Sequence, residues 1–141
     1  MNMNVMTGPK VELRIPGEPQ YVGIARMAVG AVASRMDFGV DIVEDIKLAV
    51  AEACNNAIEH AACPKGHAAD ITITLFLAQD RLAIVVCDKG AKPVALPAAR
   101  QPDDLAESGY GLLLIQALMD EFSWDAGPAG TTVRMAKLLA R

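Results

Sequence analysis

Residues 45–60 carry an apolar stripe and a polar stripe side by side at helical spacing. At about 100° per residue, four apolar side chains fall within roughly 40° of one another and form a stripe that can be buried: Ile46, Val50, Ala53 and Ala57. Glu52, Asn56 and His60 recur at steps of four along one flank of that stripe. Because a flanking side chain can leave the core and reach a neighbouring pocket, the segment predicts a half-buried helix beside a polar site.

The other polar residues of this helix predict which side chains face solvent. Asn55 and Glu59 point nearly opposite the apolar stripe and are expected to meet water. Asn56, rather than Asn55, is therefore the candidate functional asparagine. An amphipathic helix with a plain polar border is the alternative for this segment alone. For His60, a C-terminal cap that interacts with the helix dipole is a simpler interpretation than catalysis.

The length of the chain favours a single domain, and its cysteine content favours reduced thiols over disulfides. A chain of 141 residues fits a single domain, 1–141, that can bury roughly 68–70% of its unfolded surface. The three cysteines are odd in number and show no C-x-x-C spacing. Neither a disulfide framework nor a zinc site is indicated, and thiols in a reducing cytosol are expected.

Charge and hydropathy narrow the possible partners. No segment at the start resembles a signal sequence, and no apolar run approaches the ~18 residues that a bilayer span requires. We therefore expect a cytoplasmic protein with no membrane contact. A net charge of −4 argues against nucleic-acid binding, which needs a basic face to neutralise phosphates. A protein or small-molecule partner is favoured.

The order of strands and helices predicts the fold class. In chain order, the expected elements are a strand at 11–15, helices at 21–36 and 45–60, strands at 71–77 and 82–87, a helix at 111–122, a strand from 124 and a strand at 131–138. This order favours an α+β two-layer sandwich with all helices on one face of a mixed sheet. Residues 91–108 show no sustained period and predict a long connection, a type of segment that is often functional or disordered.

Two short motifs downstream suggest nucleotide binding. Asp88 ends a strand, where its carboxylate can accept a hydrogen bond from an exocyclic amine such as that of adenine. Gly90 lets the backbone pass close to a flat base. Gly109 and Gly111 open the next helix, whose first N–H groups and positive dipole end attract phosphates.

The polar flank of residues 45–60 completes this set. Asn56 offers a neutral oxygen to Mg²⁺, which prefers oxygen ligands and retains waters and phosphate oxygens. Glu52, one turn earlier, can take a proton from an attacking hydroxyl or water. Each motif alone is common in purely structural roles. An E-x-x-x-N helix followed by D-x-G and then G-x-G is far harder to obtain by accident.

With these motifs, the chain resembles the anti-sigma-factor serine-protein kinases of the RsbW type. That family lies within the nucleotide-binding superfamily shared with histidine kinases, gyrase, MutL and a heat-shock chaperone. The resemblance covers nearly the whole chain and is carried by residues 21–26, 32–36, 46–57, 109–121 and 130–137. It implies a sandwich of the histidine-kinase-like ATPase (Bergerat) type, with a mixed, mainly antiparallel sheet.

The resemblance also implies a function. Family members are ATP- and magnesium-dependent protein serine/threonine kinases that phosphorylate a serine on a small anti-anti-sigma protein of the STAS type. Otherwise they hold an RNA polymerase sigma factor inactive, and so regulate transcription in stress response or sporulation. A homodimer is implied as well.

By position, the resemblance implies roles for residues of the two long helices. Glu52 corresponds to the catalytic base and Asn56 to the magnesium ligand that also contacts ATP. Arg26, on the first helix, falls where the family meets its protein partners, although an exposed arginine is equally well explained as a solvated charge.

Other residues correspond to the family's nucleotide site. Asp88 would recognise adenine and Gly90 would make room for it. Either Thr131 or Thr132, in a G-T-T run, would add a hydroxyl to the adenine site. The superfamily pattern D-x-G-x-G is incomplete, because Lys92 replaces its second glycine.

The remaining correspondences concern the phosphates. Gly109 and Gly111 would frame the phosphate groups, and Arg100 would contact the terminal one. Arg100 is the one arginine of a short lid, and Glu107 lies close to the glycines where some relatives carry a basic residue.

Two alternatives compete with a kinase. The first is a nucleotide-binding module that sequesters sigma without kinase activity; Glu52 argues against it, because a trap needs no general base. The second is a histidine-kinase ATPase domain or a stand-alone ATPase. The sequence shows no dimerisation helix pair carrying a phospho-acceptor histidine, since His60 and His67 lie inside or just after the candidate site.

Overall fold

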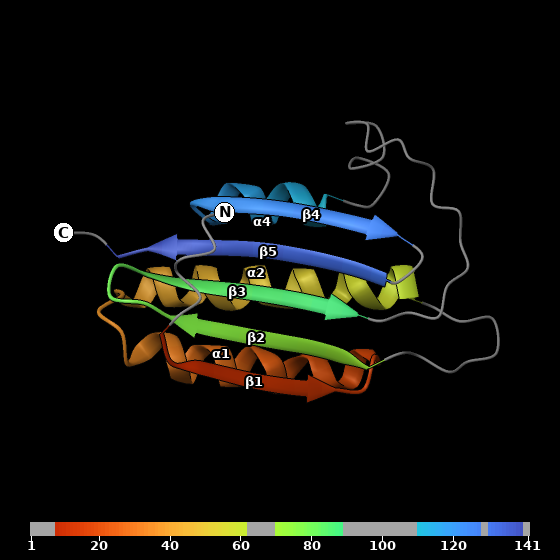
Figure 1. Ribbon diagram of the computed structural model, residues 1–141, viewed down its shortest axis with the longest axis horizontal. Coiled ribbons are helices and arrows are strands. Elements are labelled where there is room, and N and C mark those ends of the chain that lie inside the picture. Colours follow the sequence, from red (N-terminus) through yellow and green to blue (C-terminus); the bar gives the residue numbers. More distant parts are fainter. Residues whose placement is uncertain (1–7, 62–69, 89–109, 128–129, 140–141) are drawn as a thin grey trace.

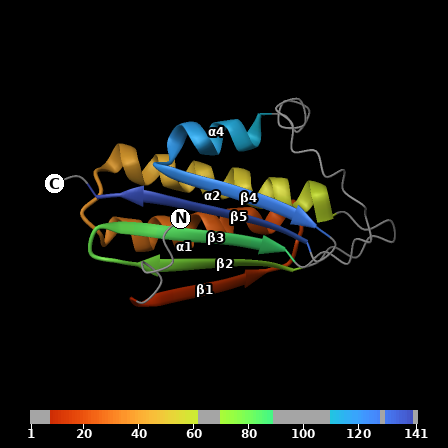
Figure 2. The ribbon, with the colours of Figure 1, turned by 45° about the horizontal axis from the view of Figure 1, so that its top comes forward.

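A five-stranded sheet forms one layer of the molecule, and helices cover one of its faces (Figures 1 and 2). The computed structural model describes residues 8–61, 70–88, 110–127 and 130–139. The strands are β1 (Lys10–Ile15), β2 (Ile71–Leu77), β3 (Arg81–Asp88), β4 (Glu121–Gly127) and β5 (Gly130–Leu138). The helices are η2 (Pro19–Tyr21), α1 (Val22–Ser34), α2 (Val40–Ala61) and α4 (Gly111–Leu118). Within these ranges, none of the helices combines the length and the apolar character of a bilayer span.

The strand order in the sheet is β1-β2-β3-β5-β4. All four described strand pairs are antiparallel, so the expected α+β sandwich is confirmed with a sheet more uniformly antiparallel than a mixed one. The register places Ile71 opposite Asp88, and Asp88 opposite Thr131. The last residue of β3 therefore lies next to the first residues of β5.

Alternation along the strands decides which side chains meet the helices. In β2, Ile71, Ile73 and Leu75 are buried, whereas Thr72 and Thr74 are only partly covered. Successive side chains of a strand point to opposite faces, so the isoleucines and the leucine form the helix-facing side of the sheet. The threonine side has no described helix over it (Figure 2).

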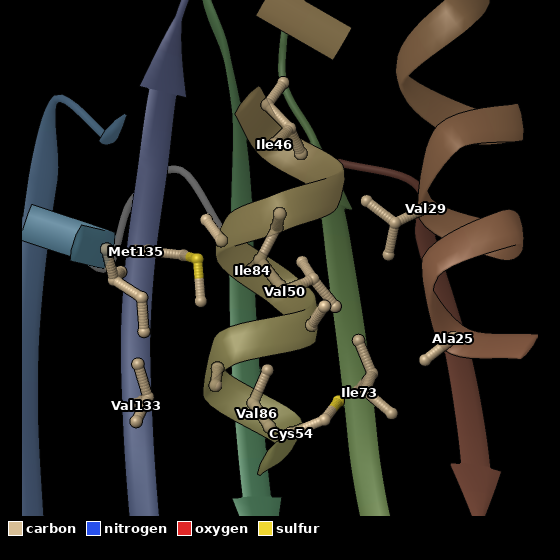
Figure 3. Close-up of a cluster of buried hydrophobic side chains, with 14 of the residues drawn as sticks. Ala25, Val29, Ile46, Val50, Cys54, Ile73, Ile84, Val86, Val133 and Met135 are labelled. Carbon is tan, nitrogen blue, oxygen red and sulfur yellow. The ribbon is translucent and has the colours of Figure 1, made fainter. Parts of the chain in front are cut away.

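The core lies between α2 and the centre of the sheet. Figure 3 shows Ile46, Val50 and Cys54 of α2 above the central strands, with Ala25 and Val29 of α1 closing one side. The strand side chains that meet them are Ile73, Ile84, Val86, Val133 and Met135. Burying one such aliphatic side chain stabilises the fold by about 1.5–3 kcal/mol. Most of the α2 stripe predicted from the sequence is therefore fully engaged with the sheet.

The expected helix at 111–122 is too long. Helix α4 ends at Leu118, and Phe122 belongs to β4. The backbone N–H of Asp120 donates to the carbonyl of Ala136, and the Asp120 carboxylate accepts from the N–H of Leu138 at 2.7 Å. Pairing with β5 thus overrides the helical spacing of the apolar residues. The other predicted elements are confirmed, with ends that differ by a few residues.

The buried thiol of Cys54 leads to a prediction about alkaline stability. Burial raises the pKa of this thiol from an ordinary 9.0 to about 12. Between those values the unfolded chain binds fewer protons than the native protein, so the free energy of unfolding should fall as pH rises. The expected slope from this thiol approaches about 1.4 kcal/mol per pH unit. Urea denaturation across this pH window measures it.

Cys54→Ala is the control for this measurement. The variant loses side-chain volume and should be less stable at neutral pH, but the contribution of this thiol to the slope disappears. Equal slopes for the wild-type protein and the variant would contradict the assignment.

Candidate active site

Helix α2 holds Glu52 and Asn56 at the edge of the core. The predicted apolar stripe is buried, and its packing fixes the rotation of the helix about its own axis. Asn56 is only 4% exposed, Glu52 is half-buried, and Asn55 and Glu59 are exposed, as the helical spacing predicted. The two candidate side chains therefore lie on the flank that borders the core, one turn apart.

An open pocket of about 370 Å³ lies beside this flank. Its lining comes from α2, from the start of η2 and from the start of α4: Pro19, Glu52, Asn55, Asn56, Ile58, Glu59 and Gly111. The pocket thus brings together three residues that the sequence singled out, Glu52, Asn56 and Gly111. A carboxylate, a carboxamide and a helix N-terminus meet there.

Gly111 allows the start of α4 to approach α2 closely. A Cβ atom at this position would lie 3.1 Å from Oε2 of Glu52 and 4.0 Å from Nδ2 of Asn56. The first of these distances is tighter than ordinary van der Waals contact, so any side chain at 111 would press on the Glu52 carboxylate. The preceding residue, Tyr110, has a positive φ of 71°, which is uncommon for a residue other than glycine.

The Asn56 carboxamide is available to a ligand. None of the hydrogen bonds between described residues involves this side chain, although it is almost fully buried. Buried polar groups are normally hydrogen-bonded, because an unpaired one costs free energy. Its position in the pocket wall gives it access to an incoming group, and its oxygen suits Mg²⁺.

A second polar pair lies at the same end of the sandwich. Asp88 is 1% exposed and Thr131 is 6% exposed, and they sit opposite each other on the helix-facing side of β3 and β5. In Figure 1 the end of β3, the start of β5 and the last turn of α2 share one end of the molecule. Neither residue lines the pocket beside Glu52. They provide a carboxylate and a hydroxyl deeper in the fold.

The turn before Thr131 depends on a glycine. Gly130 has φ of 123°, a backbone conformation that residues with a side chain rarely adopt. It pairs with Gly127 across the turn between β4 and β5. The turn sets the register of β4 with β5, whereas the separate pairing of β3 with β5 brings Thr131 opposite Asp88.

The structure separates the two candidate threonines. Thr132 projects from the other face of the sheet, where its hydroxyl donates to Sγ of Cys87 at 3.6 Å. Cys87 lines a different pocket there, together with Glu12, Arg14 and Thr72. Thr131 alone therefore shares a face with Asp88.

Arg26 is exposed on α1. Two apolar side chains near it are also exposed, Ile24 and Met27, the latter by 74%. Three other candidates, Gly90, Arg100 and Gly109, lie outside the described residues, as does the side chain of His60. Within the described ranges, no group of three or more histidine, cysteine, aspartate and glutamate side chains is arranged to hold a metal ion.

Sequence reasoning missed several pocket residues. Pro19 and Ile58 line the pocket but carry no motif, and Asn55 and Glu59 line it although their spacing assigned them to solvent. Glu59 lies two turns after Glu52 on α2, so helical spacing was a usable signal for it. The approach of Gly111 to Glu52 had no such signal, because it depends on the distance between two helices.

Comparisons with known proteins agree with this architecture. The family described as "Histidine kinase-like ATPase domain" matches residues 15–137. A serine-protein kinase RsbW of Bacillus pumilus is 43% identical over 141 residues, covering 93% of this chain and 86% of the relative. The serine-protein kinase RsbW of Bacillus subtilis is 38% identical over 138 residues, covering 92% of this chain and 85% of the relative.

Two solved structures share the fold. One contains RsbU and RsbW domains of a Mycobacterium tuberculosis protein, with a TM-score of 0.69 at 20% identity, covering 92% of this chain and 32% of that one. The other is a histidine kinase domain of the Erythrobacter litoralis blue-light activated histidine kinase, with a TM-score of 0.53 at 19% identity. It covers 96% of this chain and 67% of that one.

The contact at Gly111 predicts the effect of an added methyl group. In Gly111→Ala we expect the Glu52 carboxylate to swing away, because the far end of a side chain moves more easily than two packed helices. The free energy of unfolding should change by less than about 1 kcal/mol, since alanine favours helix. A crystal structure and urea denaturation measure the two effects.

Gly23→Ala is the matched control for this substitution. Gly23 lies in α1, and a Cβ there has no atom within 4 Å. This variant should leave the Glu52 position unchanged. An unmoved Glu52 carboxylate in Gly111→Ala would contradict the role given to Gly111.

Proposed function

Since the chain belongs to the histidine kinase-like ATPase family and, within it, to the serine-protein kinases of the RsbW type, we propose that its phosphoryl acceptor is a serine of an anti-anti-sigma protein of the STAS type. ATP with Mg²⁺ is the proposed donor. One observation carries the site assignment: Glu52, Asn56 and Gly111 line a single pocket. A base, a metal ligand and a helix N-terminus are the groups that this transfer requires.

Glu52 is proposed to accept the proton of the acceptor serine. Among the described residues, its carboxylate has no hydrogen bond or ion pair, and it opens into the pocket. As the serine oxygen forms its bond to the terminal phosphorus, the bond to the leaving ADP oxygen breaks, and the hydroxyl proton passes to Glu52. The carboxylate releases that proton to water afterwards.

Asn56 is proposed to hold Mg²⁺ through its carboxamide oxygen. Its nearly complete burial, its place in the pocket wall and its lack of a partner among the described residues fit this role. When bound, the ion neutralises phosphate charge and orients the terminal group. The N-terminal turn of α4, with Gly111, would supply N–H groups to the same phosphates.

Asp88 and Thr131 are proposed to bind adenine. The Asp88 carboxylate can accept from the exocyclic amine, and the Thr131 hydroxyl lies across the strand pair from it. Gly90, Gly109 and Arg100 keep the roles implied by the family resemblance: room for the base, framing of the phosphates and contact to the terminal phosphate. Thr132 is left out of this assignment, because its hydroxyl is on the opposite face.

The second half of the proposed function is to bind an RNA polymerase sigma factor and hold it inactive. We propose that this controls transcription in stress response or sporulation and that it takes place in the cytoplasm. The exposed α1 surface with Arg26, Ile24 and Met27 offers a charge beside apolar area, a combination suited to a protein partner. A homodimer is proposed through the N-terminal elements. In support, β1 is an edge strand, and such strands present unpaired backbone groups.

The base assignment predicts that Glu52→Ala separates transfer from binding. We expect phosphate transfer from labelled ATP to the serine of an anti-anti-sigma protein to fall by at least about a hundredfold. Nucleotide affinity should stay within about threefold, because the base acts on the acceptor hydroxyl. Transfer is followed by label on the partner, and affinity by titration calorimetry.

Glu44→Ala is the matched control on the same helix. Glu44 is exposed and pairs only with Lys47 among the described residues, at 3.0 Å, and such a surface pair contributes little to stability. This variant should transfer at the normal rate. Nucleotide binding without any transfer by the wild-type protein would favour a sigma-sequestering module, and normal transfer by Glu52→Ala would reject this base.

The assignment of Asn56 as the metal ligand predicts a loss of ATP affinity that depends on Mg²⁺. In Asn56→Ala we expect ATP affinity measured with Mg²⁺ to fall about tenfold or more, and affinity measured with EDTA to change little. Asn55→Ala removes the same carboxamide one position away, on the exposed side of α2, and should keep the magnesium-dependent affinity. Unchanged affinity in Asn56→Ala, by titration calorimetry, would count against the assignment.

A further inference from the structure

The lining of the pocket beside Glu52 includes residues that the proposed chemistry does not use. Asn55, Ile58 and Glu59 of α2 line an extension of this pocket, together with Pro19 of η2. None of these four residues has a role in phosphoryl transfer or nucleotide binding as assigned above. We therefore expect the extension to bind a group other than the nucleotide and the metal.

The charge of the extension argues against a nucleotide. Its described lining contains two carboxylates, Glu52 and Glu59, and no cationic side chain. A triphosphate tail placed against this wall would meet like charges, whose repulsion is strong outside bulk water. Backbone N–H groups or a basic side chain would instead find acceptors there. The Asn55 carboxamide and the apolar Ile58 and Pro19 add contacts typical of peptide binding.

A separate observation, on Asn56, supports the binding of a ligand in this pocket. Asn56, nearly fully buried, directs a carboxamide with no partner among the described residues into the same space. Phosphates and metal at Asn56 would fill one side of Glu52. The acidic extension then lies on the other side, where an acceptor hydroxyl has to approach the base.

We infer that Pro19, Asn55, Ile58 and Glu59 form the subsite for the polypeptide segment that carries the acceptor serine, with Glu59 receiving an N–H group or a basic side chain of that segment. This inference rests on the proposed kinase function. It assigns to Glu59 the selection of the acceptor protein, in addition to the base Glu52 and the metal ligand Asn56. The apolar wall of Ile58 and Pro19 packs against the same segment.

The helix geometry gives the position of that contact. Glu59 follows Glu52 by two turns of α2, which is a rise of about 10 Å. An extended peptide advances about 3.3 Å per residue, so the group bound by Glu59 lies about three residues from the acceptor serine. Lysine at that position of the acceptor should be favoured over glutamate.

Charge reversal at Glu59 tests the inference. The probe is the intact anti-anti-sigma protein that accepts label from the wild-type kinase, made in versions with lysine or glutamate three residues to either side of its serine. At one of the two positions, three residues before or three residues after the serine, the kcat/KM of the wild-type kinase should be at least about fivefold higher for the lysine version than for the glutamate version. Glu59→Lys should reverse that preference and raise KM for the acceptor, while the affinity for ATP with Mg²⁺ stays within about twofold.

Asp37→Lys is the matched control, because it makes the same charge change at an exposed residue between α1 and α2, at the opposite end of the molecule (Figure 1). It should keep the wild-type preference. Lysine near the C-terminal end of a helix is favourable, so Glu59→Lys is expected to fold. Glu59→Gln, which should abolish the preference without reversing it, provides a second variant.

The outcomes separate this inference from the proposed function. If the wild-type kinase labels no version of the acceptor, the proposed function fails. If it labels them but Glu59→Lys keeps the wild-type preference, only the subsite is rejected. A change confined to nucleotide affinity would also reject it, since the extension would then belong to the nucleotide.

Discussion

The packing of α2 on the sheet is the constraint from which the geometry of the site follows. Ile46, Val50 and Cys54 are fully buried against the central strands, so the helix has one stable rotation about its axis. Turning it by one residue, about 100°, would carry Glu52 toward the core, where an unpaired carboxylate is very costly. The same apolar contacts that stabilise the fold therefore aim Glu52 and Asn56 at the pocket.

Strand register positions the buried pair Asp88 and Thr131, just as the rotation of α2 positions Glu52. Asp88 and Thr131 face each other because β3 and β5 pair in one register. A slip of one residue would bring Thr132 to the helix side and Thr131 to the other. Packing positions the α2 half of the site, and backbone pairing positions the Asp88 and Thr131 half.

Periodicity predicted those parts of the structure that one element determines alone. The buried stripe of α2 and the alternation of β2 follow from local spacing, and both are confirmed. The predicted C-terminal end of α4 was wrong, because Asp120 pairs with β5 and the local sequence pattern does not indicate this pairing. The choice between Thr131 and Thr132 stayed open for a similar reason, since register depends on two strands. Residue type and spacing suggested nucleotide binding, with Glu52 as a base and Asn56 as a metal ligand. The family resemblance added the serine acceptor and the protein partners.

The contact at Gly111 connects the two sides of the site. The start of α4, which we assign to the phosphates, lies so close to Glu52 that a Cβ atom at Gly111 would be 3.1 Å from Oε2 of its carboxylate. A bound group that moved this turn toward α2 would therefore press on Glu52. A ligand changes an equilibrium only through contacts that differ between two states, and this contact is one that can differ. Any link of this kind between nucleotide and protein acceptor would be reciprocal, with each altering the affinity for the other by the same factor.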